Sequence, residues 1–290
     1  MIRQPFTFHT PHSVAEVVRL LAELGDGAKV LAGGQSLMPA MNLGVVTPQH
    51  VVSLTRLRST LSYVREEGNE IAIGALTTHH TLAVSPVLQH RRRLLAEAAA
   101  DIGDVQIRHR GTIGGSISHF DPAADYPPVC LVLGAKFRLA GPTGERLVPA
   151  EEFFVGYLTT ALNANEIVTE VRVPVLPVRT GSAYVKHRRI EGGFAIVGSA
   201  AIVEHDNNIC QRISVAVSGG GAIPFCIPDV EGRYHGKRMD ESLITEIAEA
   251  AYNAAEDPTN ELHANAEYKR EMVRVFTKRA VRVAVERVGG

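Results

Sequence analysis

Two short glycine-containing segments stand out as places where this chain could bind an anion. The first is Lys29-Val30-Leu31-Ala32-Gly33-Gly34-Gln35-Ser36, and the second is Thr112-Ile113-Gly114-Gly115-Ser116. Each follows or contains an apolar run and then turns at paired glycines, which can adopt positive φ and let a ligand approach the backbone. Neither segment carries an acidic side chain. The two segments therefore predict a site in which backbone N–H groups share one pyrophosphate.

A structural role for each segment stays open, because a single Gly-Gly pair is also the ordinary composition of a tight turn. Other nucleotide motifs do not compete with these two segments. No G-x-G-x-x-G follows an expected strand, and no G-x-x-x-x-G-K-[ST] occurs. An ordinary Rossmann or P-loop site is therefore disfavoured.

Composition narrows the class of protein. The chain has 290 residues, 45% of them hydrophobic and 21% charged, with a net charge of −1. This length suggests about two domains, and the near-neutral charge argues against a nucleic-acid partner. The start of the chain lacks an apolar signal core, and no stretch reaches the roughly eighteen apolar residues of a membrane helix. We expect a cytoplasmic protein without a membrane span.

The cysteines and histidines do not predict a metal site. Cys130, Cys210 and Cys226 are far apart and form no C-x-x-C pair, so we expect no iron–sulfur cluster or structural zinc built by this chain alone. The adjacent histidines His79 and His80 would point in opposite directions on a strand and could not easily share a metal.

The first part of the chain should position the first glycine segment. Ser13 and Glu16 form a capping box, and apolar residues at helical spacing predict a helix that ends at Gly25. Strands are expected over residues 28–32 and 51–54, which gives a small β-α-β unit around the glycine turn.

The rest of the chain predicts further strands and helices around the second glycine segment. Strands are expected over residues 61–64, 70–75, 129–133, 136–139 and 167–173, with a helix starting near Thr77 and an alanine-rich helix over 91–102. Residues 174–177 mark a boundary. Beyond it, strands over 182–185, 195–203 and 213–218 and helices over 241–256 and 266–287 form a separate α+β unit.

At this point the sequence resembles a known family, the FAD-binding medium subunits of the molybdenum hydroxylases, of the xanthine dehydrogenase, carbon monoxide dehydrogenase and quinoline oxidoreductase type. The two glycine segments in order, Asp125 nine residues past Ser116, and Glu267-Tyr268-Lys269-Arg270 near the C-terminus carry this resemblance, which runs nearly end to end. It implies an α+β fold: a two-part FAD-binding domain of the vanillyl-alcohol-oxidase/PCMH type, followed by a smaller α+β domain with a three-stranded sheet and helices. The implied FAD-binding domain covers residues 1–176, divided into 1–56 and 57–176, and the implied C-terminal domain covers 177–290.

The resemblance also implies the cofactor site, position by position. Residues 29–36 and 112–116 are similar to the pair of loops that hold the FAD pyrophosphate. Ile102 and Val168 match positions that line the cofactor, Asp125 matches an aspartate that binds it, and Lys186 matches a lysine at the flavin. Tyr184 is a candidate for the flavin edge.

The residues themselves leave other roles open. Asp125 lies among prolines and alanines, where an Asx turn is an ordinary explanation. Lys186 begins the run Lys186-His187-Arg188-Arg189, which is also typical of a solvated face, and Tyr184 is equally compatible with a core position in a strand.

The implied function is electron transfer without a catalytic residue in this chain, because the cofactor performs the redox chemistry. The resemblance implies a large molybdopterin-binding subunit and a small subunit with two [2Fe–2S] clusters as partners, in a dimer of heterotrimers. Electrons would then pass from the clusters through FAD to an external acceptor. Two alternatives remain: a self-sufficient FAD reductase or oxidase of the same fold, and a non-catalytic nucleotide-binding assembly module.

Overall fold

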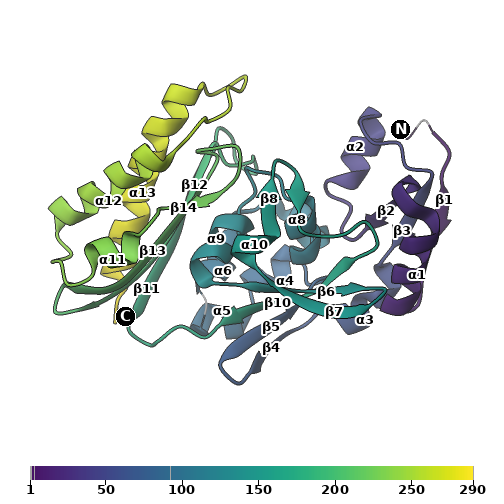
Figure 1. Ribbon diagram of the computed structural model, residues 1–290, viewed down its shortest axis with the longest axis horizontal. Helices are drawn as coiled ribbons and strands as arrows, with labels where there is room; N and C mark the ends of the chain where they lie inside the picture. Colours follow the sequence, from purple (N-terminus) through teal and green to yellow (C-terminus); the bar gives the residue numbers. More distant parts are fainter. Residues whose placement is uncertain (1, 3, 92, 290) are drawn as a thin grey trace.

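The computed structural model describes residues 2, 4–91 and 93–289 and arranges them in three parts along the longest axis (Figure 1). The N-terminal sheet lies at one end and the C-terminal sheet with its two long helices at the other. A central five-stranded sheet with its helices lies between them. Among the described residues, no helix is both long and apolar enough to cross a lipid bilayer.

The N-terminal part is a three-stranded parallel sheet in the order β1-β3-β2. Its helix α1 begins as predicted, because the Ser13 side chain accepts a hydrogen bond from the backbone N–H of Glu16. The parallel pairing of β2 and β3 confirms the expected β-α-β unit. The elements are β1 (Thr7–His9), α1 (Val14–Leu24), η1 (Gly25–Gly27), β2 (Ala28–Leu31), α2 (Leu37–Leu43), β3 (His50–Ser53) and η2 (Thr55–Leu57).

The central part is an antiparallel sheet in the order β4-β5-β10-β6-β7, with helices packed on one face. Its elements are α3 (Arg58–Leu61), β4 (Val64–Glu67), β5 (Glu70–Gly74), α4 (His79–Ala83), α5 (Pro86–Arg91), α6 (Arg93–Asp101), α7 (Val105–Arg110), α8 (Ile113–His119), α9 (Tyr126–Leu133), β6 (Lys136–Gly141), β7 (Gly144–Pro149), α10 (Ala150–Phe153), β8 (Phe154–Gly156), β9 (Thr159–Thr160) and β10 (Ile167–Pro174).

Two strand predictions in this part are wrong. Residues 129–133 belong to helix α9, which has prolines in its first turn and ends at Gly134 in a left-handed conformation. Because this helix is buried on nearly all sides, its sequence has no polar face from which a helical period could be recognised. Of residues 61–64, the first ends helix α3 and the last begins strand β4. A prediction based on hydrophobicity missed this strand because its residues 65–67 are charged.

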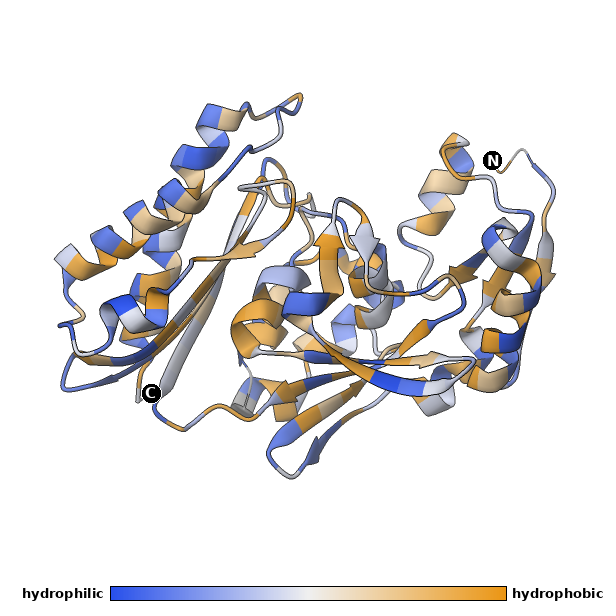
Figure 2. Cartoon of the chain, in the orientation of Figure 1, coloured by the Kyte–Doolittle hydropathy of each residue, from blue (hydrophilic) through white to orange (hydrophobic). Residues whose placement is uncertain are grey.

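The C-terminal part is an antiparallel sheet in the order β11-β12-β13-β14, covered by α12 and α13. Its three long strands match the expected three-stranded sheet, and β14 adds two residues at the edge. Figure 2 shows hydrophilic and hydrophobic stretches alternating along α12 and α13, as an amphipathic pattern requires. The elements are β11 (Thr180–His187), β12 (Val197–Asp206), β13 (Ile209–Ser218), β14 (Phe225–Cys226), α11 (Val230–Tyr234), α12 (Glu241–Ala254) and α13 (Ala266–Glu286).

The largest hydrophobic core joins the central and C-terminal parts. It packs Ile73 and Val171 of the five-stranded sheet against Leu95 and Val129 of the helices, and it continues to Tyr184 of β11. A second cluster lies between the C-terminal sheet and its helices, and a third lies under α1. The shared core fixes β11 against the central helices.

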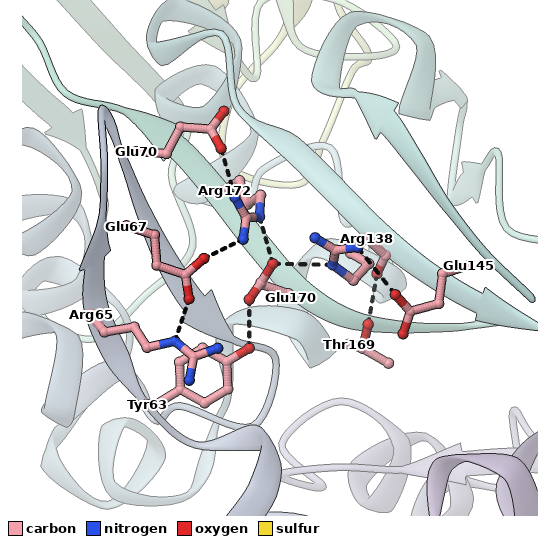
Figure 3. A network of polar contacts seen from close by, with 9 residues as sticks. All are labelled: Tyr63, Arg65, Glu67, Glu70, Arg138, Glu145, Thr169, Glu170 and Arg172. Atoms are coloured by element: carbon pink, nitrogen blue, oxygen red, sulfur yellow. Dashed lines mark hydrogen bonds and ion pairs between the residues drawn. The ribbon is translucent and has the colours of Figure 1, made fainter.

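The other face of the five-stranded sheet carries a network of ion pairs (Figure 3). Glu170 on β10 is its buried centre: it accepts hydrogen bonds from the Tyr63 hydroxyl at 2.6 Å, Arg172 Nε at 2.7 Å and Arg138 Nε at 3.2 Å. Burial opposes ionisation of Glu170, but these three donors lower its pKa below the ordinary carboxyl value. Burial first, and the hydrogen bond to Glu170 second, raise the pKa of Tyr63 to about 12.

We predict that Glu170→Ala lowers the free energy of unfolding by about 2 kcal/mol, because three donors lose one shared acceptor. Urea denaturation at neutral pH measures this change. Because its folded-state pKa is lowered, the Glu170 carboxylate stabilises the fold at pH values above its unfolded-state pKa. This stabilisation is lost as the pH falls through the folded-state pKa and the carboxylate is protonated. The gap between wild type and variant should therefore shrink below about pH 4.

The control is Glu145→Ala, because the Glu145 side chain is 54% exposed and pairs with Arg138 alone within the network of Figure 3. It should cost about 0.5 kcal/mol or less. Equal losses for the two variants would contradict a central role for Glu170.

Candidate functional site

A cavity of about 550 Å³ lies where the three parts of the structure meet. The first glycine segment, the second glycine segment and the end of β11 all contribute to its wall. The lining includes the following sequence-predicted residues: Lys29, Val30, Ala32, Gly33, Gly34, Gln35, Ser36, Ile102, Thr112, Gly114, Gly115, Ser116, Asp125, Val168 and Lys186. Segments that are far apart in the sequence thus share one cavity.

Three predicted residues are not in the cavity wall. Leu31 belongs to strand β2, Ile113 is fully buried in the hydrophobic core, and Tyr184 packs into the same core. Tyr184 nevertheless reaches the site indirectly, because its hydroxyl donates a hydrogen bond to Asp125 Oδ1 at 2.6 Å.

The two glycine segments meet through their backbones. A Cβ atom added to Gly33 would lie 2.3 Å from the carbonyl oxygen of Arg110 and 2.8 Å from the Cα of Gly111. These neighbours are backbone atoms that cannot move aside independently of the chain. Only glycine at position 33 therefore lets the loop after β2 lie directly against the residue that precedes Thr112.

The first glycine segment presents free hydrogen-bond donors to the cavity. Within the described parts of the chain, the backbone N–H groups of residues 33–36 have no protein acceptor. All four of these residues line the cavity, and Gly34 has the positive φ of +80° that the sequence predicted. Successive N–H groups around such a residue form a concave donor site for an anion.

The second segment differs from the expected turn. Thr112 is the N-cap of helix α8, and neither Gly114 nor Gly115 has a positive φ. Their N–H groups already have acceptors in the Ala75 carbonyl at 2.9 Å and Thr112 Oγ1 at 3.2 Å. Glycine is needed at position 114 for close packing instead, because a Cβ there would lie 2.5 Å from the Cβ of Ala75. This segment contributes the start of a helix, including Ser116, to the cavity wall.

A buried charge pair forms another wall of the cavity. Lys186 Nζ lies 3.0 Å from Asp125 Oδ1 and also donates to the backbone oxygen of Asp101 at 3.1 Å. The Asp125 and Lys186 side chains are only 5% and 1% exposed. Burial raises the pKa of Asp125, opposed by Lys186 and by the Tyr184 hydroxyl, while burial and the nearby Asp125 raise the pKa of Tyr184 well above its ordinary value. Both Asp125 oxygens already accept hydrogen bonds from protein donors, Oδ1 from the Tyr184 hydroxyl and Oδ2 from Lys186 Nζ.

Sequence reasoning missed several residues in the cavity wall. Leu158 and Leu162 come from the β8–β9 hairpin and the loop after it, Phe194 follows the pair Gly192-Gly193, and His79 begins α4. Each is a single side chain contributed by a different element, so no spacing within the sequence could have grouped them.

The described residues contain no cluster of three or more His, Cys, Asp or Glu side chains that could hold a metal ion. The three cysteines are unpaired, with Cys130 and Cys210 buried and Cys226 exposed. The cavity offers backbone donors, apolar walls and a few charged side chains, among them the buried Lys186. This set of groups suits a dinucleotide with a diphosphate.

Comparison with known proteins agrees with this geometry. Residues 4–176 match the family described as the FAD binding domain in molybdopterin dehydrogenase, and residues 182–284 match the CO dehydrogenase flavoprotein C-terminal domain. The chain belongs to this family of FAD-binding medium subunits of molybdenum hydroxylases, which confirms the resemblance seen in its motifs. FAD is the cofactor of its first domain.

Individual relatives are similar over nearly their whole length. The carbon monoxide dehydrogenase medium chain of Hydrogenophaga pseudoflava is 40% identical over 284 residues, covering 98% of each chain. A subunit of the 6-hydroxypseudooxynicotine dehydrogenase complex of Paenarthrobacter nicotinovorans is 37% identical, covering 97% of this chain and 95% of that one. A solved structure of the Hydrogenophaga pseudoflava carbon monoxide dehydrogenase superposes with a TM-score of 0.96, covering 99% of this chain and 100% of that one. The relatives are oxidoreductases, and so is this chain's family.

We predict that Gly33→Ala abolishes tight FAD binding, because the new methyl group must push the first segment away from Arg110 and Gly111. Flavin retained on the purified variant, measured by absorbance after gel filtration, checks this. The control is Gly27→Ala in the same part, whose Cβ would meet only the Gln49 side chain at 3.4 Å. Full flavin retention by Gly33→Ala would contradict the proposed role of the contact.

Proposed function

We propose that this chain carries electrons from the [2Fe–2S] clusters of a small partner subunit, through its FAD, to an external acceptor. The observation that supports the proposal best is the single cavity to which both glycine segments contribute, in a chain of the FAD-binding medium-subunit family. FAD supplies one- and two-electron redox chemistry when bound. No residue of this chain acts as a general acid or base in the proposal.

In this proposal the backbone N–H groups of residues 33–36 bind the FAD diphosphate. The start of α8 lies beside them, and Gly114, Gly115 and Ser116 of that helix also line the cavity. Ile102 and Val168 contribute apolar surface to the same cavity.

Lys186 is proposed to place a positive charge at the flavin. Its ammonium group is held by Asp125 and by the Asp101 carbonyl, so it has little freedom to move away. A cation near the ring favours the reduced, more negative form of the flavin. Asp125 acts through Lys186, and Tyr184 acts through Asp125, so both are positioning residues.

The proposed partner subunits would supply the metal centres, because the described residues contain no cluster of side chains that could hold a metal ion. The family's relatives are medium chains or subunits of larger dehydrogenases. We propose a large molybdopterin-binding subunit and a small [2Fe–2S] subunit, assembled as a dimer of heterotrimers. We also propose that residues 1–176 form the FAD-binding domain, in two parts, and that residues 177–290 form the C-terminal domain.

The test uses the assembled complex purified with its partners. We expect denaturation to release about one FAD per copy of this chain, and the large subunit's substrate to bleach the flavin under anaerobic conditions. Failure to release flavin from folded complex would overturn the assignment. Steady turnover by this chain alone would favour a self-sufficient reductase or oxidase, and flavin that substrate never bleaches would favour a non-catalytic assembly module.

A further inference from the structure

His79 is a buried side chain in the cavity wall with no role in the function described so far. It is the first residue of α4, follows the N-cap Thr78, and is only 4% exposed. Its Nδ1 atom lies 2.9 Å from the hydroxyl oxygen of Tyr126. Its backbone N–H donates to the carbonyl of Gly111 at 3.0 Å, which ties α4 to the second glycine segment.

The hydrogen bond to Tyr126 determines which ring nitrogen carries the proton. Tyr126 is fully buried, and among the described residues its hydroxyl has His79 as its one hydrogen-bond partner. A buried tyrosine hydroxyl with one partner donates its proton to that partner, so Nδ1 is the acceptor. Burial first, and the nearby Arg108 second, lower the pKa of His79 to about 4, so the ring is neutral at pH 7. Its single N–H is therefore at Nε2.

Nε2 lies where the two glycine segments touch. A Cβ atom on Gly111 would be 2.5 Å from Nε2, and the Cα of Gly111 is the atom that a Cβ on Gly33 would approach to 2.8 Å. Within the described chain Nε2 has no hydrogen-bond acceptor. It is also not one of the unpaired side-chain atoms that are completely enclosed by protein. A buried donor without a protein acceptor, in the wall of a cavity, is satisfied by water when no ligand is bound and is free to donate to a bound ligand.

We propose that His79 binds the cofactor by donating its Nε2–H to an oxygen of the FAD diphosphate. This inference rests on the proposed function and adds a residue to that site. The neutral ring joins the free N–H groups of residues 33–36 as a donor fixed in direction, because Tyr126 holds its opposite edge. Glycine is then required at position 111 as well, since a side chain there would displace the imidazole.

The experiment compares ligand affinities of the full chain after removal of flavin. His79→Leu alone would leave the Tyr126 hydroxyl unpaired, so the informative comparison is between the wild type and the double variant Tyr126→Phe/His79→Leu, in which neither buried partner is left unsatisfied. Relative to the wild type, the double variant should bind FAD and ADP about 10- to 100-fold more weakly, which is the usual effect of losing a hydrogen bond to a charged group. Its affinity for adenosine, which lacks a diphosphate, should be unchanged.

Two further variants complete the test. His79→Gln retains an N–H donor and should recover part of the lost FAD affinity. His80→Leu is the matched control, because His80 is adjacent, lies outside the cavity wall and stacks on His109 with ring centroids 4.0 Å apart.

The outcomes separate this inference from the proposed function. A double variant that binds FAD as tightly as the wild type would overturn the role of His79 and leave the FAD site intact. A parallel loss of adenosine affinity would also overturn it, since a general disturbance of the cavity weakens every ligand. A wild-type chain that binds no FAD would overturn the proposed function itself.

Discussion

The contact between Gly33 and the Arg110–Gly111 backbone is the constraint on which the cavity depends. It joins two segments about eighty residues apart in the sequence without any side chain between them. Strand β2 delivers the first segment to this contact, and helix α8 begins directly beyond it. Because the backbones touch, the unpaired N–H groups of residues 33–36 lie beside a helix N-terminus instead of facing open solvent. A single methyl group at position 33 would separate these two features.

The second requirement is that the C-terminal sheet be fixed against the central helices. Tyr184 and Lys186 project from β11 to the one carboxylate of Asp125, at the start of α9. Breaking a buried ion pair by removing one partner is expensive, because it leaves a charge without compensation. The pair therefore both closes the cavity and couples it to the packing of the shared core. The buried charge pair lies in this wall, while the first glycine segment offers the backbone N–H groups of residues 33–36.

Much of this arrangement follows from local sequence, and the exceptions have physical reasons. Helix α1 was predictable because Ser13 and Glu16 cap it, and helices α12 and α13 were predictable because each has one polar face. Helix α9 was not, since its apolar run is buried all around and resembles a buried strand. The glycines at 114 and 115 line the cavity, but packing against Ala75 explains Gly114, and positive φ explains neither. His79 could not be assigned because its partners Tyr126 and Gly111 come from other elements.

The central claim is that the backbone N–H groups of the first glycine segment bind a diphosphate beside the start of α8. The most direct measurement is an amide ¹H–¹⁵N NMR titration of the full chain, freed of flavin, with ADP and in parallel with adenosine. We expect ADP, and not adenosine, to shift the amide signals of residues 33–36 strongly toward lower field, as new hydrogen bonds to phosphate oxygens require. Shifts that leave residues 33–36 unchanged and cluster elsewhere while ADP is bound would contradict the account.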